Sequence, residues 1–321
     1  MRALRYNGQS VILDTHAAEP ALAPGEAIIK PMVMGVSAGD IDVARGLVAF
    51  PGVMGQECVG VVERVADSEN KHLVGERVVV ATSVACATCD LCKKGLSTHC
   101  RSRSIIGLRN RDGCFADRVA VPVRNLFAVP RGVSDEEAVF AELVAAALHT
   151  RTAVKADGRP FVTVLGDGAL GLLTVQVMAK QNAHVRMVGQ HESRLAICDR
   201  WGIRHRLQSQ VGHRQDQDVV IDCTGSASGM ESALRMVRPR GKIILKNTAD
   251  TARGATVNIA PIVTGEIEIV GSRGGSIPEA LGTLATRQID VLPLITRRGK
   301  LSDGVQLVTS AQGQIKVLIA A

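Results

Sequence analysis

Two patterns of hydrophobic positions follow one another along the chain. Up to about residue 130, short runs alternate apolar and polar residues and are separated by clusters of Gly, Pro and Asp. Such runs are typical of strands in a half-buried sheet. They lie at 27–36, 58–65, 77–81 and 115–121. The first part of the chain, residues 1–133, is therefore predicted to be a β-rich domain.

The pattern changes at residue 134. Ser134 and Glu137 form a capping-box sequence ahead of an apolar-periodic stretch, which predicts a helix to about residue 150. Short apolar strands then alternate with helical stretches, at 161–165, 184–188, 218–222, 241–245 and 266–270. This order predicts a doubly wound parallel sheet over residues 134–287, and an α/β fold class overall.

The tail from residue 288 returns to short strand signals, at 305–308 and 315–319. We expect residues 288–321 to rejoin the first domain, which makes that domain discontinuous in sequence.

Composition is that of an ordinary globular protein with an aliphatic core. Of the 321 residues, 46% are hydrophobic, 21% are charged and only 2% are aromatic. The formal net charge is +7, but the densest basic stretch, 101–111, has no aromatic side chain that could stack on bases. We therefore expect no nucleic-acid partner, and the positive surplus suits an anionic substrate or a cofactor phosphate.

No segment is predicted to cross a membrane. The most apolar region, 161–179, contains Asp167 and three glycines, which suits a buried strand, a turn and a helix. The chain opens without the apolar run of a signal peptide, so a cytoplasmic location is expected. A reducing compartment disfavours a disulfide framework among the eight cysteines.

A strand at 161–165 runs directly into a Gly-x-Gly-x-x-Gly sequence and then into a helix, the context in which this motif binds a dinucleotide. Gly166 suits the sharp turn, Gly168 lets the backbone approach a pyrophosphate, and Gly171 allows close packing of helix on strand. The helix N-terminus then faces the phosphates. The predicted cofactor-binding residues of this loop are Gly166, Asp167, Gly168, Ala169, Leu170 and Gly171.

The end of the second strand bears on the choice of cofactor. An acid there would bind the ribose 2′-hydroxyl of NAD, but the strand ends in Gly189 and Gln190. The missing carboxylate makes room for a 2′-phosphate, with which His191 and Arg194 can pair. NADP is therefore favoured over NAD, which stays an alternative. Thr224 and Gly225, in a turn after a later strand, are expected to line the same crevice.

Four cysteines, Cys86, Cys89, Cys92 and Cys100, lie within fifteen residues in a lobe at about 84–102. Four thiolates at this spacing suit one closed tetrahedral Zn²⁺ site of a structural kind. An iron–sulfur cluster is the main alternative, but its common run has a shorter last spacing followed by proline. A redox-active pair is a further alternative.

With these motifs placed, the chain resembles the zinc-dependent alcohol dehydrogenases of the medium-chain dehydrogenase/reductase superfamily over essentially its whole length. The four-cysteine lobe, the helix at 141–149, the glycine fingerprint and Gly271-Ser272-Arg273 carry the likeness. The resemblance implies a GroES-like catalytic domain, 1–133 with 288–321, and a Rossmann domain, 134–287. It also implies a small-molecule substrate and a homo-oligomer, a dimer or a tetramer.

The same resemblance shows a departure at the catalytic zinc. The family takes a cysteine and a histidine ligand where this chain has Ser37 and Gln56, and Gly39 replaces the hydroxyl residue that starts the family's proton relay. A neutral oxygen and an amide bind zinc poorly. Asp40, Glu57 and Glu142 remain of the polar set. These substitutions predict an NAD(P)(H)-dependent oxidoreductase without a catalytic zinc, in which Ser37 and Gln56 donate hydrogen bonds to the developing oxyanion.

Two other functions stay open from the sequence. One is a metal-dependent alcohol dehydrogenase whose site is rebuilt from Glu57 and Glu142; the other is a non-enzymatic dinucleotide-binding module. For single residues, other roles stay open. Gln56 can serve only to hydrogen-bond the backbone of its turn, Glu57 and Glu142 can be a buried charge and its partner, and His149 can be a packed or helix-C-terminal histidine.

Overall fold

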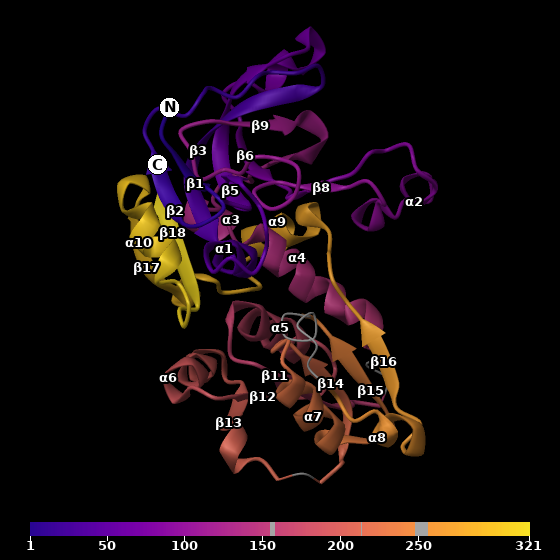
Figure 1. The fold of residues 1–321 in the computed structure, drawn as a ribbon. Helices are drawn as coiled ribbons and strands as arrows, with labels where there is room; N and C mark the ends of the chain where they lie inside the picture. Colours follow the sequence, from indigo (N-terminus) through magenta and orange to yellow (C-terminus); the bar gives the residue numbers. More distant parts are fainter. Residues whose placement is uncertain (155–157, 213, 248–255) are drawn as a thin grey trace. The chain divides into compact units, whose positions relative to one another are not determined.

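The structure is a computed structural model that describes residues 1–154, 158–212, 214–247 and 256–321. The chain divides into two compact units, Met1–Glu142 with Ile277–Ala321, and Leu143–Ser276 (Figure 1). The C-terminal residues thus fold with the first unit. Among the described residues, no helix is long and apolar enough to cross a membrane.

The first unit is built on a mainly antiparallel sheet in the order β10-β6-β5-β3-β18-β17, with β9 also paired to β3. A smaller sheet has the order β2-β1-β4. Alternating side chains of these strands, among them Leu4, Ile29 and Met34, fill a core together with Phe115 from a loop, and all four are fully buried. The strands are β1 (Ala3–Tyr6), β2 (Val11–Asp14), β3 (Glu26–Val36), β4 (Gly52–Val53), β5 (Glu57–Val65), β6 (Arg77–Val80), β9 (Val119–Pro122), β10 (Leu126–Ala128), β17 (Ile295–Lys300) and β18 (Lys316–Ala320).

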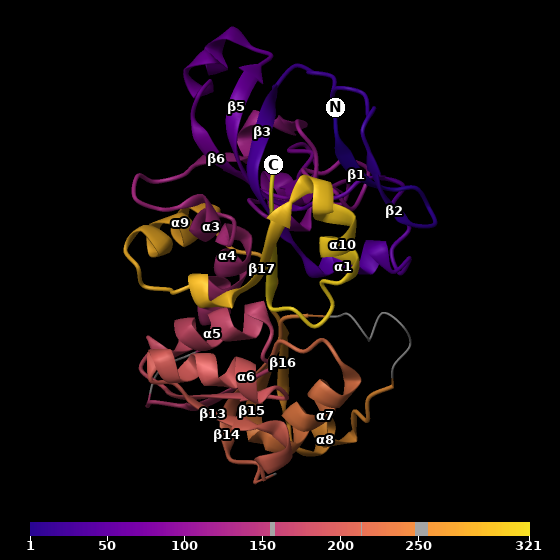
Figure 2. The ribbon, with the colours of Figure 1, turned by 90° about the vertical axis from the view of Figure 1, so that its left-hand side faces the viewer.

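Short helices accompany this sheet, and one of them corrects an expectation. The stretch 305–308 was predicted as a strand but lies in α10, beside α1 in Figure 2. Gly304, Leu307 and Val308 are its buried positions, a helical i, i+3, i+4 spacing that so short a run could not distinguish from a strand. The helices of this unit are α1 (Ala38–Ala44), α3 (Asp135–Ala138), α9 (Ile277–Ala285) and α10 (Gly304–Thr309). A further helix, α4 (Ala141–His149), begins in the first unit and belongs to the second from Leu143 onward.

Two other expected elements are shorter than predicted. The helix predicted over 134–150 is divided into α3 and α4 by a turn at Val139 and Phe140, whose side chains are buried. The strand predicted at 115–121 is limited to β9, because Phe115 leaves the strand pattern to bond backbone groups of Leu4 and Met54.

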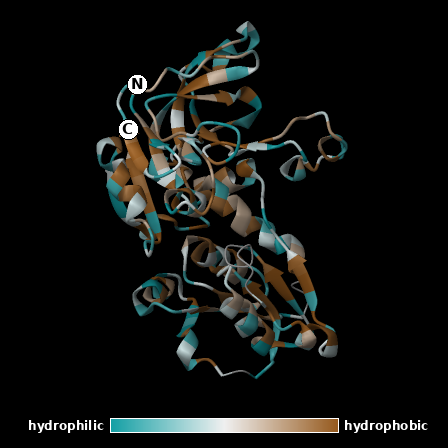
Figure 3. Cartoon of the chain, in the orientation of Figure 1, coloured by the Kyte–Doolittle hydropathy of each residue, from teal (hydrophilic) through white to brown (hydrophobic). Residues whose placement is uncertain are grey.

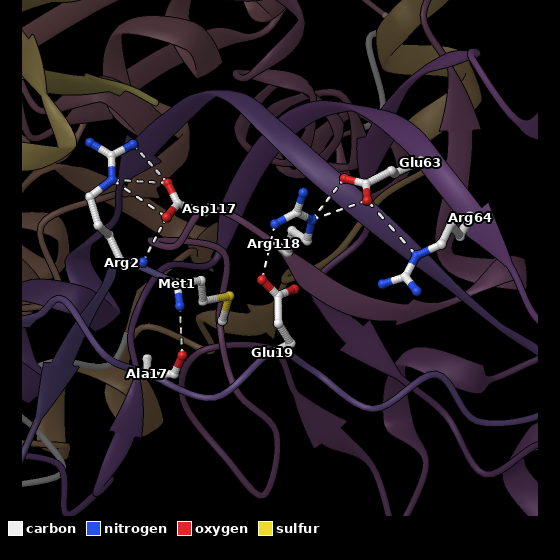
Figure 4. A network of polar contacts seen from close by, with 8 residues as sticks. All are labelled: Met1, Arg2, Ala17, Glu19, Glu63, Arg64, Asp117 and Arg118. Carbon is white, nitrogen blue, oxygen red and sulfur yellow. Dashed lines mark hydrogen bonds and ion pairs between the residues drawn. The ribbon is translucent and has the colours of Figure 1, made fainter.

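Surface ion pairs join distant segments of the first unit (Figure 4). Arg118 contacts both Glu19 and Glu63, and Arg2 contacts Asp117. These side chains are partly exposed, and pairs of this kind contribute at most about 1 kcal/mol each. Part of the positive charge of this unit is thus paired with carboxylates.

The second unit contains a parallel sheet in the order β13-β12-β11-β14-β15-β16, whose direction of winding reverses between β11 and β14. This is the strand order of a Rossmann fold. The strands are largely hydrophobic, as buried parallel strands are (Figure 3). They are β11 (Phe161–Leu165), β12 (His184–Gly189), β13 (Arg204–Leu207), β14 (Gln217–Asp222), β15 (Val237–Leu245) and β16 (Glu268–Gly271).

Helices pack on this sheet as the sequence pattern indicates. The helix after the glycine fingerprint, α5, packs on β11 and β12, and α7 packs on β14 and β15. Every strand predicted in this region is present, whereas β13 was missed because its Arg-His-Arg-Leu sequence is polar, as suits an edge strand. The remaining bounds are α5 (Ala169–Ala179), α6 (Glu192–Leu195), α7 (Ala227–Met236) and α8 (Ala260–Thr264).

Candidate functional site

In the loop after β11, each of the three glycines has the conformation or the surroundings that the sequence motif predicts. Gly166 has a φ of 101°, which favours glycine. Gly168 is the N-cap of α5, and a side chain there would meet open space. A Cβ at Gly171 would overlap the carbonyl oxygen of Gly166, so only glycine lets α5 approach the turn this closely. The loop thus leaves the start of α5 open to a phosphate.

A cavity of about 480 Å³ lies at the carboxyl ends of the strands in the second unit. It is where an α/β sheet binds its ligand, at the point where strand order reverses, and its volume is in the range of ligand sites. Of the residues predicted to bind the cofactor, it is lined by Gly166, Asp167, Gly168, Gly189, Gln190 and Thr224. The other six predicted residues are not among the lining residues; they are Ala169, Leu170, Gly171, His191, Arg194 and Gly225.

The cavity also brings in residues that sequence reasoning missed. They are Leu165, Val188, Gln208, Cys223, Ser226, Ser228, Gly229 and Asn247. Most of them follow the carboxyl ends of β13, β14 and β15. The sequence could have indicated them only through the predicted end of each strand, because ligands of such sheets bind there. These loops can hold a dinucleotide, whose nicotinamide supplies hydride chemistry.

Asp167 is the most heavily bonded residue of the glycine loop. Its Oδ2 accepts the backbone N–H groups of Gln190 and His191 at 2.8 and 2.7 Å. Its Oδ1 lies 3.1 Å from His191 Nδ1 and 3.5 Å from Arg194 Nη1. Burial raises the pKa of Asp167, but the hydrogen bonds from His191 and Gln190 outweigh it and hold the pKa below its usual value. The carboxylate is therefore ionised in neutral solution.

A second polar cluster of the second unit was not predicted. Lys246 follows β15, and its Nζ donates to the carbonyl oxygen of Ala146 at 2.7 Å and to Ser272 Oγ at 2.9 Å. His149 Nδ1 lies 3.1 Å from the same hydroxyl. Burial lowers the pKa of Lys246 to about 8. His149 is thus an exposed histidine at the C-terminal end of α4 that contacts Ser272, as one sequence alternative held.

In the first unit, Ser37 and Asp40 form a capping box at the start of α1. Ser37 Oγ donates to Asp40 Oδ2 at 2.7 Å and accepts the backbone N–H of Asp40 at 3.2 Å. Asp40 Oδ1 accepts the backbone N–H of Gly55 at 3.0 Å. Asp40 is fully buried, and burial raises its pKa to about 6. The pair can therefore exchange a proton close to neutral pH.

Gln56 adjoins this pair and has an unused donor. Among the described residues, its buried Nε2 has no hydrogen-bond partner. The same atom lies 2.5 Å from the position that a Cβ would occupy at Gly39. The interpretation that Gln56 serves only its turn leaves this donor unexplained, because a buried amide N–H without a partner costs free energy.

Glu57 has a partner that the sequence did not reveal. Its carboxylate pairs with the ammonium of Lys316 in β18, and both side chains are almost fully buried. Lys316 Nζ also donates to the carbonyl oxygen of Val36 at 3.2 Å and lies 5.6 Å from the ring centre of Phe140. Burial still raises the pKa of Glu57, against the effect of Lys316.

Glu142 is held separately from Glu57. Its Oε1 accepts the backbone N–H of Thr82 at 2.8 Å and the Thr82 hydroxyl at 2.9 Å. The alternative that Glu57 and Glu142 are a buried charge and its partner is therefore wrong, since Lys316 is the cation that pairs with Glu57.

The residues around Ser37 do not fit a tetrahedral zinc. Ser37 Oγ is committed to the capping box, Gln56 offers an amide, and Glu57 is paired with Lys316. Zinc prefers thiolate, imidazole and free carboxylate ligands.

The four cysteines, by contrast, fit a metal ion well. Their Sγ atoms all lie within 4.8 Å of one another, and tetrahedral zinc with bonds of about 2.3 Å places sulfurs about 3.8 Å apart. Backbone N–H groups of Cys86 and Cys89 donate to sulfur atoms of the same lobe, at 3.3 and 3.4 Å. Hydrogen bonding, first from Thr88, lowers the pKa of Cys86 to about 5, whereas burial raises the pKa of Cys92 to about 12. The lobe comprises β7 (Ser83–Val84), α2 (Asp90–Lys93) and β8 (Ser104–Ile105).

Comparisons with known proteins agree with this geometry. Residues 23–131 match the family model "Alcohol dehydrogenase GroES-like domain" and residues 169–288 match "Zinc-binding dehydrogenase". L-idonate 5-dehydrogenase from Vitis vinifera is 30% identical, covering 87% of this chain and 82% of that protein. D-altritol 5-dehydrogenase from Agrobacterium fabrum is 28% identical, with both chains covered in full.

Solved structures show the same fold. A zinc-binding dehydrogenase from Sinorhizobium meliloti, bound to NADP, is 25% identical with a TM-score of 0.88 and covers 100% of this chain and 99% of its own. A short chain alcohol dehydrogenase from Escherichia coli, complexed with NADH, has a TM-score of 0.90 at 24% identity and the same coverage. The predicted GroES-like and Rossmann folds are thereby confirmed. The chain belongs to the zinc-type alcohol dehydrogenases of the medium-chain dehydrogenase/reductase superfamily, and it is an NAD(P)-dependent oxidoreductase of the alcohol dehydrogenase type.

Proposed function

We propose that this chain transfers hydride between a nicotinamide cofactor and an alcohol or carbonyl compound, or an activated alkene, without a zinc ion at the substrate oxygen. The observation that carries the proposal is the buried Nε2 of Gln56, a donor without a partner among the described residues, beside the hydrogen-bonded pair of Ser37 and Asp40. When bound, the nicotinamide supplies or accepts the hydride. The protein's own residues then have to stabilise charge on oxygen and move one proton.

Gln56 supplies the stabilisation. Hydride addition to a carbonyl builds negative charge on the oxygen, and a preorganised N–H donor in a buried site stabilises that charge more than water does. Removing one such donor typically lowers kcat by about 100- to 1,000-fold. The amide of Gln56 thus takes the electrostatic role that a metal ion has in zinc enzymes.

Ser37 and Asp40 supply the proton. When Asp40 is ionised, the Ser37 hydroxyl donates to it, as the structure has it. When Asp40 is protonated, its O–H donates to Ser37 Oγ, and the serine proton is free to pass to the alkoxide. A pKa of about 6 lets Asp40 lose and regain this proton near neutral pH. Alcohol oxidation runs the same transfers in reverse.

The cysteine lobe takes a different part in the proposal. We propose that Cys86, Cys89, Cys92 and Cys100 hold one structural zinc per chain, because four sulfur atoms at tetrahedral spacing suit a closed site. A rebuilt metal site at Glu57 and Glu142 would give a second metal. The ion pair of Glu57 with Lys316 and the bonds of Glu142 to Thr82 argue against it.

The proposal also covers the substrate class, the assembly and the location. The relatives named for L-idonate, sorbitol and D-altritol make polyhydroxylated compounds the first substrates to test. A homo-oligomer would extend the sheet through β16, an edge strand with the exposed side chain of Ile269. The cytoplasmic location stays a prediction. The sequence alone favours NADP over NAD as the cofactor, a preference that the contacts of Asp167 oppose.

The test measures turnover over a panel of polyols, alcohols, aldehydes and enones after dialysis against a chelator, with zinc counted on the same sample. We expect one zinc per chain and undiminished activity. The variant Ser37→Ala/Gln56→Leu should lose turnover by at least 100-fold. Ser134→Ala removes a capping-box serine of the same kind from α3 and controls for lost stability. Unchanged turnover in the double variant, or two metals needed for activity, would refute the proposal.

A further inference from the structure

Rossmann folds that bind NAD usually have a carboxylate that hydrogen-bonds the adenosine ribose. In this chain Asp167, in the glycine loop, places a carboxylate in the same region. In this fold the acid usually comes from the end of the second strand. In this chain that strand, β12, ends in Gly189, and a Cβ added to Gly189 would lie 2.5 Å from Asp167 Oδ2 and 2.6 Å from Asp167 Cβ. The Asp167 side chain therefore fills the space in which a side chain at residue 189 would begin.

The bonds of Asp167 show what this placement does to the surrounding donors. Its two oxygens face the backbone N–H groups of Gln190 and His191, the His191 ring and the Arg194 guanidinium. A carboxylate has about four lone-pair positions, so these four donors saturate it. His191 and Arg194, which the sequence suggested as partners of a 2′-phosphate, thus already contact the carboxylate of Asp167.

We propose that Asp167 makes this chain prefer NAD(H) to NADP(H), by placing a fixed negative charge, which already accepts the nearby donors, beside the adenosine ribose. The inference rests on the proposed function, since it assigns the cofactor of that same site. A phosphomonoester at the 2′ position carries a charge of about −1.5 to −2 near pH 7 and would have to compete with Asp167 for His191 and Arg194. A neutral 2′-hydroxyl meets no such repulsion.

Burial makes the repulsion effective. Asp167 is only 5% exposed, so little water separates its charge from a ligand in the cavity it lines. Gln190 and Gln208 complete this wall of the cavity, with Gln190 Nε2 donating to Gln208 Oε1 at 3.1 Å. These neutral amides suit ribose hydroxyls and offer no additional cation to a phosphate.

The test measures dissociation constants of NADH and NADPH for the full-length, zinc-loaded protein by enhancement of nicotinamide fluorescence. We expect the wild type to bind NADH at least tenfold more tightly than NADPH. The variant Asp167→Asn keeps the size of the side chain and an oxygen for the backbone N–H groups but removes the charge. It should reduce the NADH preference at least tenfold, mainly by tighter NADPH binding, while NADH affinity changes less than about threefold.

Glu192→Gln is the matched control. Glu192 is an exposed acid at the start of α6, close to Asp167 in the same region, and Glu192→Gln raises the net charge by one, as Asp167→Asn does. We expect it to change the ratio of the two dissociation constants less than about threefold. An equal gain in NADPH affinity in this control would assign the effect to general electrostatics and overturn the role of Asp167.

The remaining outcomes separate the inference from the proposed function. Tighter binding of NADPH than of NADH by the wild type would overturn the inference alone and needs no variant. An unchanged ratio in a folded Asp167→Asn protein, judged by its circular dichroism, would also overturn it. Binding of neither cofactor by the wild type would refute the proposed function, and the inference with it.

Discussion

Gln56 Nε2 lies 2.5 Å from the position that a Cβ would take at Gly39. Both residues differ from what the family resemblance implies, and the contact shows that the two differences are linked in space. A hydroxyl residue at position 39 and the present conformation of Gln56 exclude each other sterically. The site is therefore a coherent rearrangement of the region around Ser37, in which an amide takes the room of the family's relay side chain.

The contact predicts an energetic coupling between Gly39 and Gln56. Gly39 lies in the first turn of α1, where alanine should add about 0.5–1 kcal/mol of helix stability. In the wild type that gain is offset, because the Gln56 amide has to move. We expect Gly39→Ala to stabilise the Gln56→Ala variant but not the wild type, with a coupling of about 1 kcal/mol in a urea-denaturation cycle. Additive effects would contradict the steric link.

A second zinc should bind when the family's ligands are restored. Ser37→Cys/Gln56→His introduces a thiolate and an imidazole, the ligands zinc prefers, beside Glu57 and Glu142. We expect elemental analysis to find one more zinc per chain than in the wild type. Ser37→Cys/Gln56→Leu provides the control, which keeps the thiol without the imidazole and should bind no extra zinc. Equal zinc in all three proteins would mean that the residues are not in the ligand positions.

The raised pKa of Asp40 predicts a particular pH dependence of stability. Burial raises the pKa from 3.8 to about 6, so between these values the folded protein holds a proton that the unfolded chain has lost. The unfolding free energy of the wild type minus that of Asp40→Asn should therefore fall as the pH rises from 4 to 7, by about 2 kcal/mol. Urea denaturation of both proteins across this range measures it. A difference that stays flat or grows would show that Asp40 is not destabilised as an anion.

The buried pair of Glu57 and Lys316 should be strongly coupled. Lys316→Met leaves a buried carboxylate without its cation and should cost about 3–5 kcal/mol, whereas Glu57→Gln/Lys316→Met should cost clearly less. Arg298→Met is the control, because it breaks a well-formed pair with Glu136 whose side chains are 53% and 37% exposed, and it should cost less than about 1 kcal/mol. If the double variant is no more stable than Lys316→Met, Glu57 is not the group that needs the lysine.

Local patterns in the sequence were sufficient to predict much of the second unit. A strand, three spaced glycines and a helix form a contiguous motif, and its geometry depends on neighbouring residues, so Gly166, Gly168 and Gly171 serve the purposes expected of them. The four cysteines are likewise close in sequence, and their sulfurs converge. Where two periodicities fit one short run, as at 305–308, the sequence predicted the wrong element.

The sequence by itself determined the fold class and the family, because both depend on residue identities at fixed spacing. It also places Ser37 and Gln56 where the family resemblance implies zinc ligands. Only the tertiary structure decided which charged side chains contact one another. Lys316 reaches Glu57 across 259 residues because β18 and β5 both pair with β3, and Asp167 reaches Gly189 because β11 pairs with β12. Such partners are set by strand pairing and register, for which no local pattern of side chains provides a signal.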